Sequence, residues 1–170
     1  IKDNLIDIKD DGTFRLNIKY FKFHRGFRMT SSKFNKLFGA PPREKESELT
    51  QFHMDIAASI QDVTEEIVLK LARSLKKETN QKNLCLSGGV ALNCVANGKL
   101  KKEKIFENIW IQPASGDAGS ALGAALLSSY QYLNYQRFVN PLDSMKGAYL
   151  GCNFSNDQII SYLKEIKANY

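Results

Sequence analysis

Two glycine-rich turns, each set between a short apolar run and a segment of helical pattern, constrain the fold of this chain most strongly. The first turn, residues 87–93, follows the run 83–86, and the second, residues 115–120, follows the run 108–112. Runs this short that end near glycine are typical of buried strands. The pattern therefore predicts strand, turn and helix twice in succession.

The two strands are expected to be parallel neighbours in one sheet. The helices that follow them are expected from about residue 90 to 102 and from about 118 to 135. Short connections of this kind close through right-handed crossovers. Both turns would then lie at the carboxyl edge of the sheet, where open α/β sheets bind their ligands.

The front of the chain predicts a β-hairpin. Apolar residues at 5–8 and an alternating pattern at 13–20 flank a turn at 10–12. This hairpin would make the sheet mixed instead of purely parallel. The aromatic and basic strip at 20–27 is expected to be a half-buried strand with exposed cations, and a border of a ligand cleft is the alternative. A short helix is expected around 33–38.

A long amphipathic helix is predicted from about residue 50 to 78. Its apolar residues recur at steps of three and four and mark one face: Phe52, Ile56, Ile60, Val63, Ile67, Leu71 and Leu75. A further short helix is expected from about 156 to 167. We therefore divide the chain into one lobe at 1–140 and, at 141–170, a linker with the start of the next domain of a longer protein.

The net charge of +6 would suit an anionic ligand, but the surplus is spread over several places. It includes Lys19, Lys22, Arg25, Arg28, Lys33 and the run 99–104, and a solvated surface accounts for most of it. No zinc-finger, helix-turn-helix or RNP-type pattern accompanies the charge, so nucleic-acid binding is not expected.

No apolar stretch approaches the roughly 20 residues that cross a bilayer, and the first residues do not form a signal peptide, so a cytoplasmic location is expected. Cys85, Cys94 and Cys152 are odd in number and lack C-x-x-C spacing. These features argue against disulfides and a zinc knuckle, and buried free thiols are expected.

The first turn has two interpretations. Gly88 and Gly89 let the backbone approach an anion, and the following helix offers unpaired N–H groups to a phosphate, with hydrogen bonds from Ser87 and Asn93. The glycines also suit a tight turn from strand to helix without any ligand. Neither a Walker loop nor a G-x-G-x-x-G pattern is present.

The second turn adds a carboxylate. Asp117 stands between Gly116 and Gly119 at the mouth of a helix, where aspartate is a favoured N-cap. A carboxylate at the end of a strand beside a phosphate turn is also where a divalent cation would be held by oxygen. The residues alone leave both roles open.

Beyond these local patterns, the chain resembles a known family. Residues 84–98 and 112–125 resemble the O-carbamoyltransferases of nodulation-factor and antibiotic-tailoring pathways. The resemblance extends to the segments at 11–20, 38–43 and 53–61, and so covers most of the chain.

The resemblance implies an α/β fold of the actin-like, sugar-kinase and Hsp70 ATPase type, with a mixed β-sheet flanked by helices, of which this chain is the second lobe. It also implies chemistry. Such enzymes use ATP and carbamoyl phosphate to form a carbamoyl-adenylate in a C-terminal domain. They transfer the carbamoyl group to a hydroxyl of a sugar or natural product in the actin-like domain, with the help of a bound divalent metal, iron being one candidate.

Carried over by position, the resemblance places Gly88, Gly89 and Asn93 in a nucleotide-contacting turn and Gly116 and Gly119 in a second phosphate-side turn. Asp117 matches the metal-binding aspartate of the family. A catalytic base is not identified.

The family's other metal ligands, two histidines and an aspartate, come from the first lobe and have no matching motif here. His24 and His53 are the only histidines, and structural roles are expected for both. These 170 residues alone are therefore expected to bind metal poorly and to catalyse nothing, because they lack the missing lobe and the C-terminal domain.

Two other classes stay open. One is a kinase or ATPase of the same superfamily, or an enzyme that transfers threonylcarbamoyl to tRNA. Nothing in the chain supplies an obvious base for phosphoryl transfer. The other is a non-catalytic interaction module in which the glycines only form turns.

Overall fold

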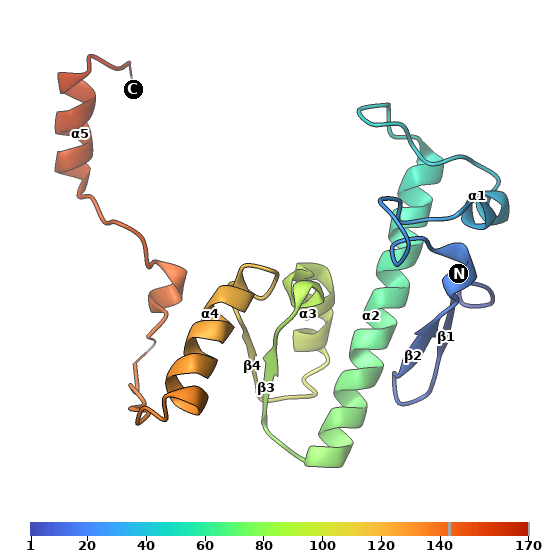
Figure 1. The fold of residues 1–170 in the computed structure, drawn as a ribbon, viewed down its shortest axis with the longest axis horizontal. Helices are drawn as coiled ribbons and strands as arrows, with labels where there is room; N and C mark the ends of the chain where they lie inside the picture. Colours follow the sequence, from blue (N-terminus) through green and yellow to red (C-terminus); the bar gives the residue numbers. More distant parts are fainter. Residues whose placement is uncertain (143, 170) are drawn as a thin grey trace. The chain divides into compact units, whose positions relative to one another are not determined.

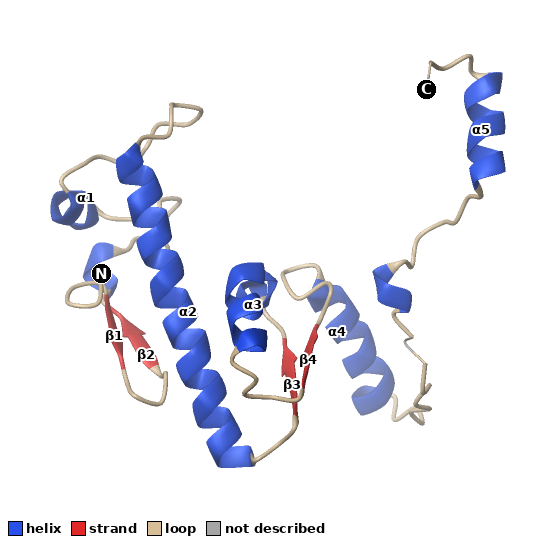
Figure 2. Cartoon of the chain, turned by 180° about the vertical axis from the view of Figure 1, so that it is seen from behind, coloured by secondary structure: helices blue, strands red, loops and turns tan. Residues whose placement is uncertain are grey.

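A computed structural model describes residues 1–142 and 144–169. The chain divides into two compact units, Ile1–Gly119 and the segment from Ser120 onward. The first unit combines two small sheets with helices, and the second is helical (Figures 1 and 2). The predicted α/β class is therefore confirmed for the first unit, which carries the first glycine turn and all but the last residue of the second.

The predicted hairpin is present. Strands β1 (Ile6–Ile8) and β2 (Phe14–Leu16) are antiparallel. Asp11 closes the turn, since its Oδ1 accepts hydrogen bonds from the backbone N–H of Thr13 at 2.9 Å and from the hydroxyl of Thr13 at 2.7 Å. The second strand is shorter than predicted, because the chain coils into a 3₁₀ turn at Ile18–Tyr20.

Helix α2 (Gln51–Thr79) matches the predicted long helix and is the longest element of the described chain. At its start, the backbone N–H of Thr50 donates to Nδ1 of His53 at 3.1 Å. At its end, Asn80 adopts a left-handed conformation with φ of 51°. The helix lies between the hairpin and helix α3 (Figures 1 and 2).

The second sheet has two parallel strands, as predicted. They are β3 (Asn83–Leu86) and β4 (Asn108–Ile111), and helix α3 (Cys94–Lys102) connects them. The core packs between this sheet, α3 and the C-terminal half of α2. Its buried members are Ala72, Leu84, Leu100 and Phe106.

The prediction of one mixed sheet is wrong in the part of the chain that the structure describes. The strands form two separate two-stranded sheets, one antiparallel and one parallel. The physical reason is the position of α2, which packs against the hairpin on one side and against α3 on the other, so the hairpin strands cannot reach β3 or β4 (Figures 1 and 2).

Two further expectations are wrong. The strip 20–27 is not a strand, since only Phe21 forms a bridge, with Thr30, and the chain turns back through hydrogen bonds that include Arg25 N–H to Lys22 O at 2.9 Å. The three cysteines are free, as expected, but exposed. Cys85, for example, lies on the face of β3 opposite the core, where its register partner Trp110 is 48% exposed.

The remaining helices follow the predicted positions. Helix α1 (Ser32–Phe38) ends at Gly39, and α4 (Gly119–Leu127) continues into a π-helical turn at Ser128–Tyr132. Helix α5 (Asn156–Glu165) begins with a capping box formed by Ser155 and Gln158. In the described ranges, no helix is long and apolar enough to span a membrane.

Gly12 tests the contact between the hairpin and α2. Its φ is +88°, and a Cβ at this position would lie 2.4 Å from the backbone nitrogen of Leu71. We expect Gly12→Ala to lower the free energy of unfolding by about 2 kcal/mol, from the left-handed backbone and the clash together. Urea denaturation measures it.

Gly26→Ala is the matched control, because a Cβ there has nothing within 4 Å and the φ of Gly26 lies outside the left-handed range. Equal unfolding midpoints for the two variants would contradict the packing of the hairpin turn on α2.

Candidate functional site at the two glycine turns

The two glycine turns leave the same edge of the parallel sheet, as the sequence predicts. The last residues of the strands, Leu86 and Ile111, are register partners, and Gln112 donates its backbone N–H to the carbonyl of Leu86 at 3.1 Å. Beyond the strands the turns stay close: a Cβ built on Gly116 would lie 3.8 Å from Cδ1 of Leu92.

The two glycines of the first turn differ in what they are needed for. Gly88 has φ of 95° and ψ of 159°. Residues that carry a Cβ rarely adopt this conformation, so the backbone itself requires glycine. Gly89 begins a 3₁₀ turn, its φ lies outside the left-handed range, and a Cβ there would meet nothing within 4 Å. Neither backbone nor packing in the described chain requires glycine at position 89.

Asn93 ends this turn and caps α3. Its Oδ1 accepts a hydrogen bond from the backbone N–H of Ala96 at 3.1 Å. The expected helix start near residue 90 is therefore wrong, because Gly89–Leu92 forms a 3₁₀ turn and Asn93 is extended, with φ of −72° and ψ of 91°. Asparagine is among the favoured N-cap residues, and this signal could have located the helix start.

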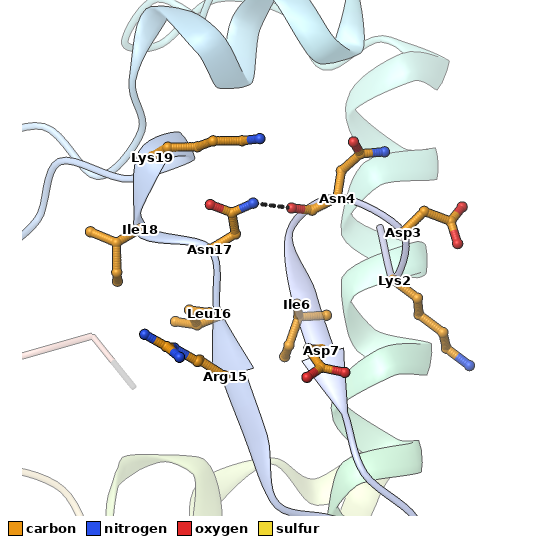
Figure 3. A pocket seen from close by; sticks show the side chains of 10 residues that line it. All are labelled: Lys2, Asp3, Asn4, Ile6, Asp7, Arg15, Leu16, Asn17, Ile18 and Lys19. Carbon is orange, nitrogen blue, oxygen red and sulfur yellow. Dashed lines mark hydrogen bonds between the residues drawn. The ribbon is translucent and has the colours of Figure 1, made fainter.

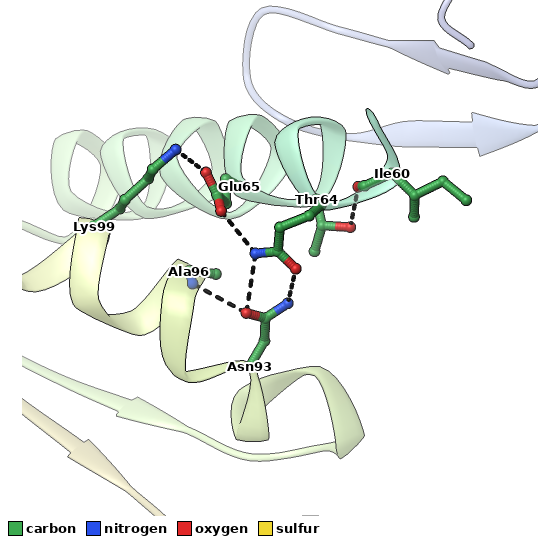
Figure 4. Close-up of polar contacts among 7 residues, drawn as sticks. Ile60, Thr64, Glu65, Asn93, Ala96 and Lys99 are labelled. Atoms are coloured by element: carbon green, nitrogen blue, oxygen red, sulfur yellow. Dashed lines mark hydrogen bonds and ion pairs between the residues drawn. The ribbon is translucent and has the colours of Figure 1, made fainter. Parts of the chain in front are cut away.

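A pair of side-chain amides joins this cap to α2 (Figure 4). Gln61 Nε2 donates to Asn93 Oδ1 at 3.1 Å, and Asn93 Nδ2 donates to Gln61 Oε1 at 2.8 Å. Both amides thus act as donor and acceptor at once. Sequence reasoning missed Gln61, and no local pattern marks it.

Two charged residues extend the network (Figure 4). Gln61 Nε2 also donates to Glu65 Oε1 at 2.7 Å, and the other carboxylate oxygen of Glu65 pairs with Lys99 on α3. The side chain of Glu65 is only 4% exposed. Burial of a carboxylate is costly unless it is paired, and here Lys99 and Gln61 supply the partners.

The same contacts shift the titration of Glu65. The hydrogen bond from Lys99 lowers the pKa of Glu65 most, and the hydrogen bond from Gln61 lowers it further. A carboxyl group whose pKa is lower in the folded state stabilises the fold above its unfolded-state pKa. That contribution is lost as the pH falls through the folded-state value.

The second turn contains a buried hydroxyl and two glycines. Ser115 is 5% exposed, and its Oγ has no hydrogen-bond partner among the described residues. A Cβ at Gly119 would lie 2.0 Å from the carbonyl oxygen of Ala114, so close packing requires glycine there. Gly116 has no comparable restriction, since Cδ1 of Leu92 at 3.8 Å is in ordinary contact.

Asp117 is exposed at the mouth of α4. The helix begins at Gly119, and the carboxylate of Asp117 accepts no hydrogen bond and forms no ion pair within residues 1–142 and 144–169. The N-cap interpretation of Asp117 is therefore not realised. No group of three His, Cys, Asp or Glu residues that could hold a metal occurs in the same residues.

The two histidines lie away from the turns. His53 has the structural role expected for it, because its ring accepts the hydrogen bond at the start of α2. His24 is exposed, and its ring contacts Phe23 edge-on, with 5.8 Å between the ring centroids.

The parallel strands and the two glycine turns define an α/β protein whose turns lie at the carboxyl edge of the sheet, where such proteins bind ligands. Comparison with known proteins gives the family. The sequence profile described as Carbamoyltransferase N-terminus matches residues 1–126. The chain belongs to this carbamoyltransferase family, as its sequence motifs suggest.

Similar proteins agree with this assignment. The chain is 59% identical to the uncharacterized protein sll1178 of Synechocystis over 164 residues, which cover 96% of this chain and 27% of that protein. It is 41% identical to nodulation protein NolO of Bradyrhizobium diazoefficiens over 116 residues, 68% of this chain and 20% of NolO.

Nodulation protein NolNO of Sinorhizobium fredii is also 41% identical, over 118 residues that cover 69% of this chain and 17% of NolNO. The chain thus spans about a quarter or less of the length of these relatives.

A double-mutant cycle tests the amide pair. We expect Asn93→Ala alone to cost about 1–2 kcal/mol of unfolding free energy, since it removes the cap of α3. With Gln61→Ala, the two changes should be non-additive by at least about 0.5 kcal/mol, because each leaves the other amide without its partner. Thermal unfolding of the four proteins measures the coupling.

Gln81→Ala combined with Asn93→Ala is the control, because Gln81 is exposed and does not contact Asn93. That combination should be additive. Additive effects for Gln61 and Asn93 as well would show that the amides do not support each other.

Proposed function

We propose that this chain is part of an O-carbamoyltransferase that forms a carbamoyl-adenylate from ATP and carbamoyl phosphate and passes the carbamoyl group to a hydroxyl of a sugar or natural product. Membership of the carbamoyltransferase family supports the assignment of carbamoyl as the transferred group. In this proposal the chain contributes one wall of a cleft of the actin-like type, and the rest of a longer polypeptide contributes the other.

The observation that carries the proposal is the unexplained glycine at position 89. Gly89 lies at the open edge of the sheet, where its side chain could be larger without strain or clash. At this edge, a glycine lets a ligand, here the nucleotide phosphates, approach the backbone closely. Gly116 supports the same interpretation, since neither backbone nor packing demands it.

Most hydrogen-bonding groups of the Asn93 side chain are already used within the protein, which limits its contact with a nucleotide. Its Oδ1 accepts two hydrogen bonds and one N–H of its Nδ2 is used by Gln61. A primary amide carries two N–H donors, so one N–H of Nδ2 is left for a ligand. We therefore assign Asn93 first to positioning of the turn and second to a single hydrogen bond with the nucleotide.

Asp117 and Ser115 provide oxygen groups that have no partner among the described residues. The exposed carboxylate of Asp117 suits a divalent metal, iron among the candidates, with further ligands supplied by the rest of the protein. Such a metal would act as a Lewis acid on the transferred carbonyl or on the acceptor hydroxyl. Gly119 serves the turn itself, because it allows close packing on Ala114.

Replacement of Gly89 by alanine tests the nucleotide assignment. We expect the Gly89→Ala variant to keep the stability of the parent chain, because the added methyl group enters open space. Its affinity for ADP should fall about tenfold or more, since the methyl group would meet the phosphates. Isothermal titration with millimolar ADP and a divalent ion measures the ADP affinity of the parent chain and of the variant.

Gly98→Ala in α3 is the matched control, because a Cβ there also meets nothing within 4 Å. It should leave the ADP affinity unchanged. Failure of the parent chain to bind ADP, or equal affinities for all three proteins, would favour a turn without a ligand.

A further inference from the structure

The positive charge of the chain is concentrated in one segment. Residues 12–43 contain eight of the 24 lysines and arginines and none of the 18 acidic residues. The rest of the chain therefore carries 16 basic and 18 acidic residues. The segment thus carries a charge of +8 and the rest of the chain −2, so the net charge of +6 arises from this segment.

Within the segment, the structure forms a pocket of about 580 Å³. Its lining combines cations, hydroxyls and apolar groups: Ile18, Lys19, Phe21, Lys22, His24, Arg25, Ser31, Ser32 and Lys33. No carboxylate lines it. We call it the basic pocket. Its volume falls within the range of about 300–1,000 Å³ that is typical of small-molecule sites.

The cations of the basic pocket form no ion pair in the part of the chain that the structure describes. Ion pairs among the described residues involve other basic residues, namely Lys2, Lys9, Lys70, Arg73, Lys82 and Lys99. Lys19 lies over the ring of Tyr20, with 4.8 Å from Nζ to the ring centroid, and this contact leaves its charge uncompensated. Like charges that share a pocket repel each other, and an anion in the pocket would relieve this repulsion.

A neighbouring pocket shows the contrast (Figure 3). It measures about 460 Å³ and lies along the hairpin, where Asp3 and Asp7 accompany its lysines and Arg15. Two carboxylates thus share this lining with its three cations. Absence of acidic side chains is therefore a property of the basic pocket and not of every hollow in this part of the chain.

We propose that the basic pocket binds a small molecule that carries a phosphate monoester. Lys22, Arg25 and Lys33 provide charge for the phosphate, and Ile18 and Phe21 provide an apolar wall for the body of the ligand. No residue of the two glycine turns lines this pocket, so the proposal does not depend on the nucleotide assignment.

The concentration of the charge favours a small ligand over a nucleic acid. All lining residues come from the stretch 18–33, and they surround one hollow. Single-stranded nucleic acids are bound along grooves that track several nucleotides, with charge distributed along the path. A compact pocket matches a single phosphate group better.

Calorimetric titration of the chain with glucose 6-phosphate, inorganic phosphate and glucose tests the proposal. We expect glucose 6-phosphate to bind and glucose to fail, because the phosphate supplies the charge. Inorganic phosphate should bind more weakly than the ester, because it cannot use the apolar wall. Affinity should fall as salt increases, since the contacts are ionic.

The variant Lys22→Ala/Arg25→Ala should reduce the affinity for glucose 6-phosphate about tenfold or more. Both side chains are exposed and form no ion pair within the described chain, so the fold should persist, which circular dichroism checks. Lys101→Ala/Lys102→Ala, on the exposed side of α3, removes the same charge elsewhere and should change the affinity less than twofold.

Equal losses of glucose 6-phosphate affinity in the two double variants would show that binding depends only on the net charge of the chain, and would overturn the proposal. Failure of glucose 6-phosphate to bind would overturn it directly. Binding of single-stranded RNA or of phosphatidylserine vesicles with a loss in the pocket variant, and no binding of the phosphate ester, would also overturn it in favour of a macromolecular partner.

Discussion

The reciprocal hydrogen bonds between Gln61 and Asn93 are the constraint on which the candidate site depends. They join the middle of the longest helix to the residue that ends the first glycine turn. Through Asn93 they fix the start of α3, and through Gln61 they reach the buried Glu65 and its partner Lys99. The position of the turn is therefore set by polar contacts across two helices as well as by the sheet below it.

This network changes the physical meaning of the first turn. Gly88 is needed for the backbone, Asn93 is needed for the helix and for α2, and Gly89 is needed for neither. The three residues that looked equivalent in the sequence thus divide into two that build the turn and one that keeps its surface open. A ligand site requires both kinds, because an open surface is useful only when its position is fixed.

Much of the fold could be predicted because it follows from local patterns. The apolar spacing of α2 and the short runs of β3 and β4 placed these elements within about two residues, and the crossover rule gave their parallel pairing. The hairpin was also correct, but its membership of a single sheet was not, because packing of α2 decides which strands can meet.

The missed features are non-local. Gln61 and Asn93 are 32 residues apart, and their pairing leaves no periodic trace in the sequence. Exposure of Cys85 depends on which face of β3 the core covers. The nucleotide and metal assignments of Gly89 and Asp117 stay predictions, for which the structure offers an open turn and a carboxylate without a partner in residues 1–142 and 144–169.

The most direct test of the central claim is replacement of Asp117 by alanine in a full-length carbamoyltransferase that contains these residues, with the two half-reactions measured separately. The account predicts that pyrophosphate release, which reports carbamoyl-adenylate formation, continues, whereas transfer to the acceptor and the bound metal are both lost. Asp10→Ala, which removes another exposed carboxylate, should change neither. Transfer at the parent rate with unchanged metal content in the Asp117→Ala protein would contradict the account.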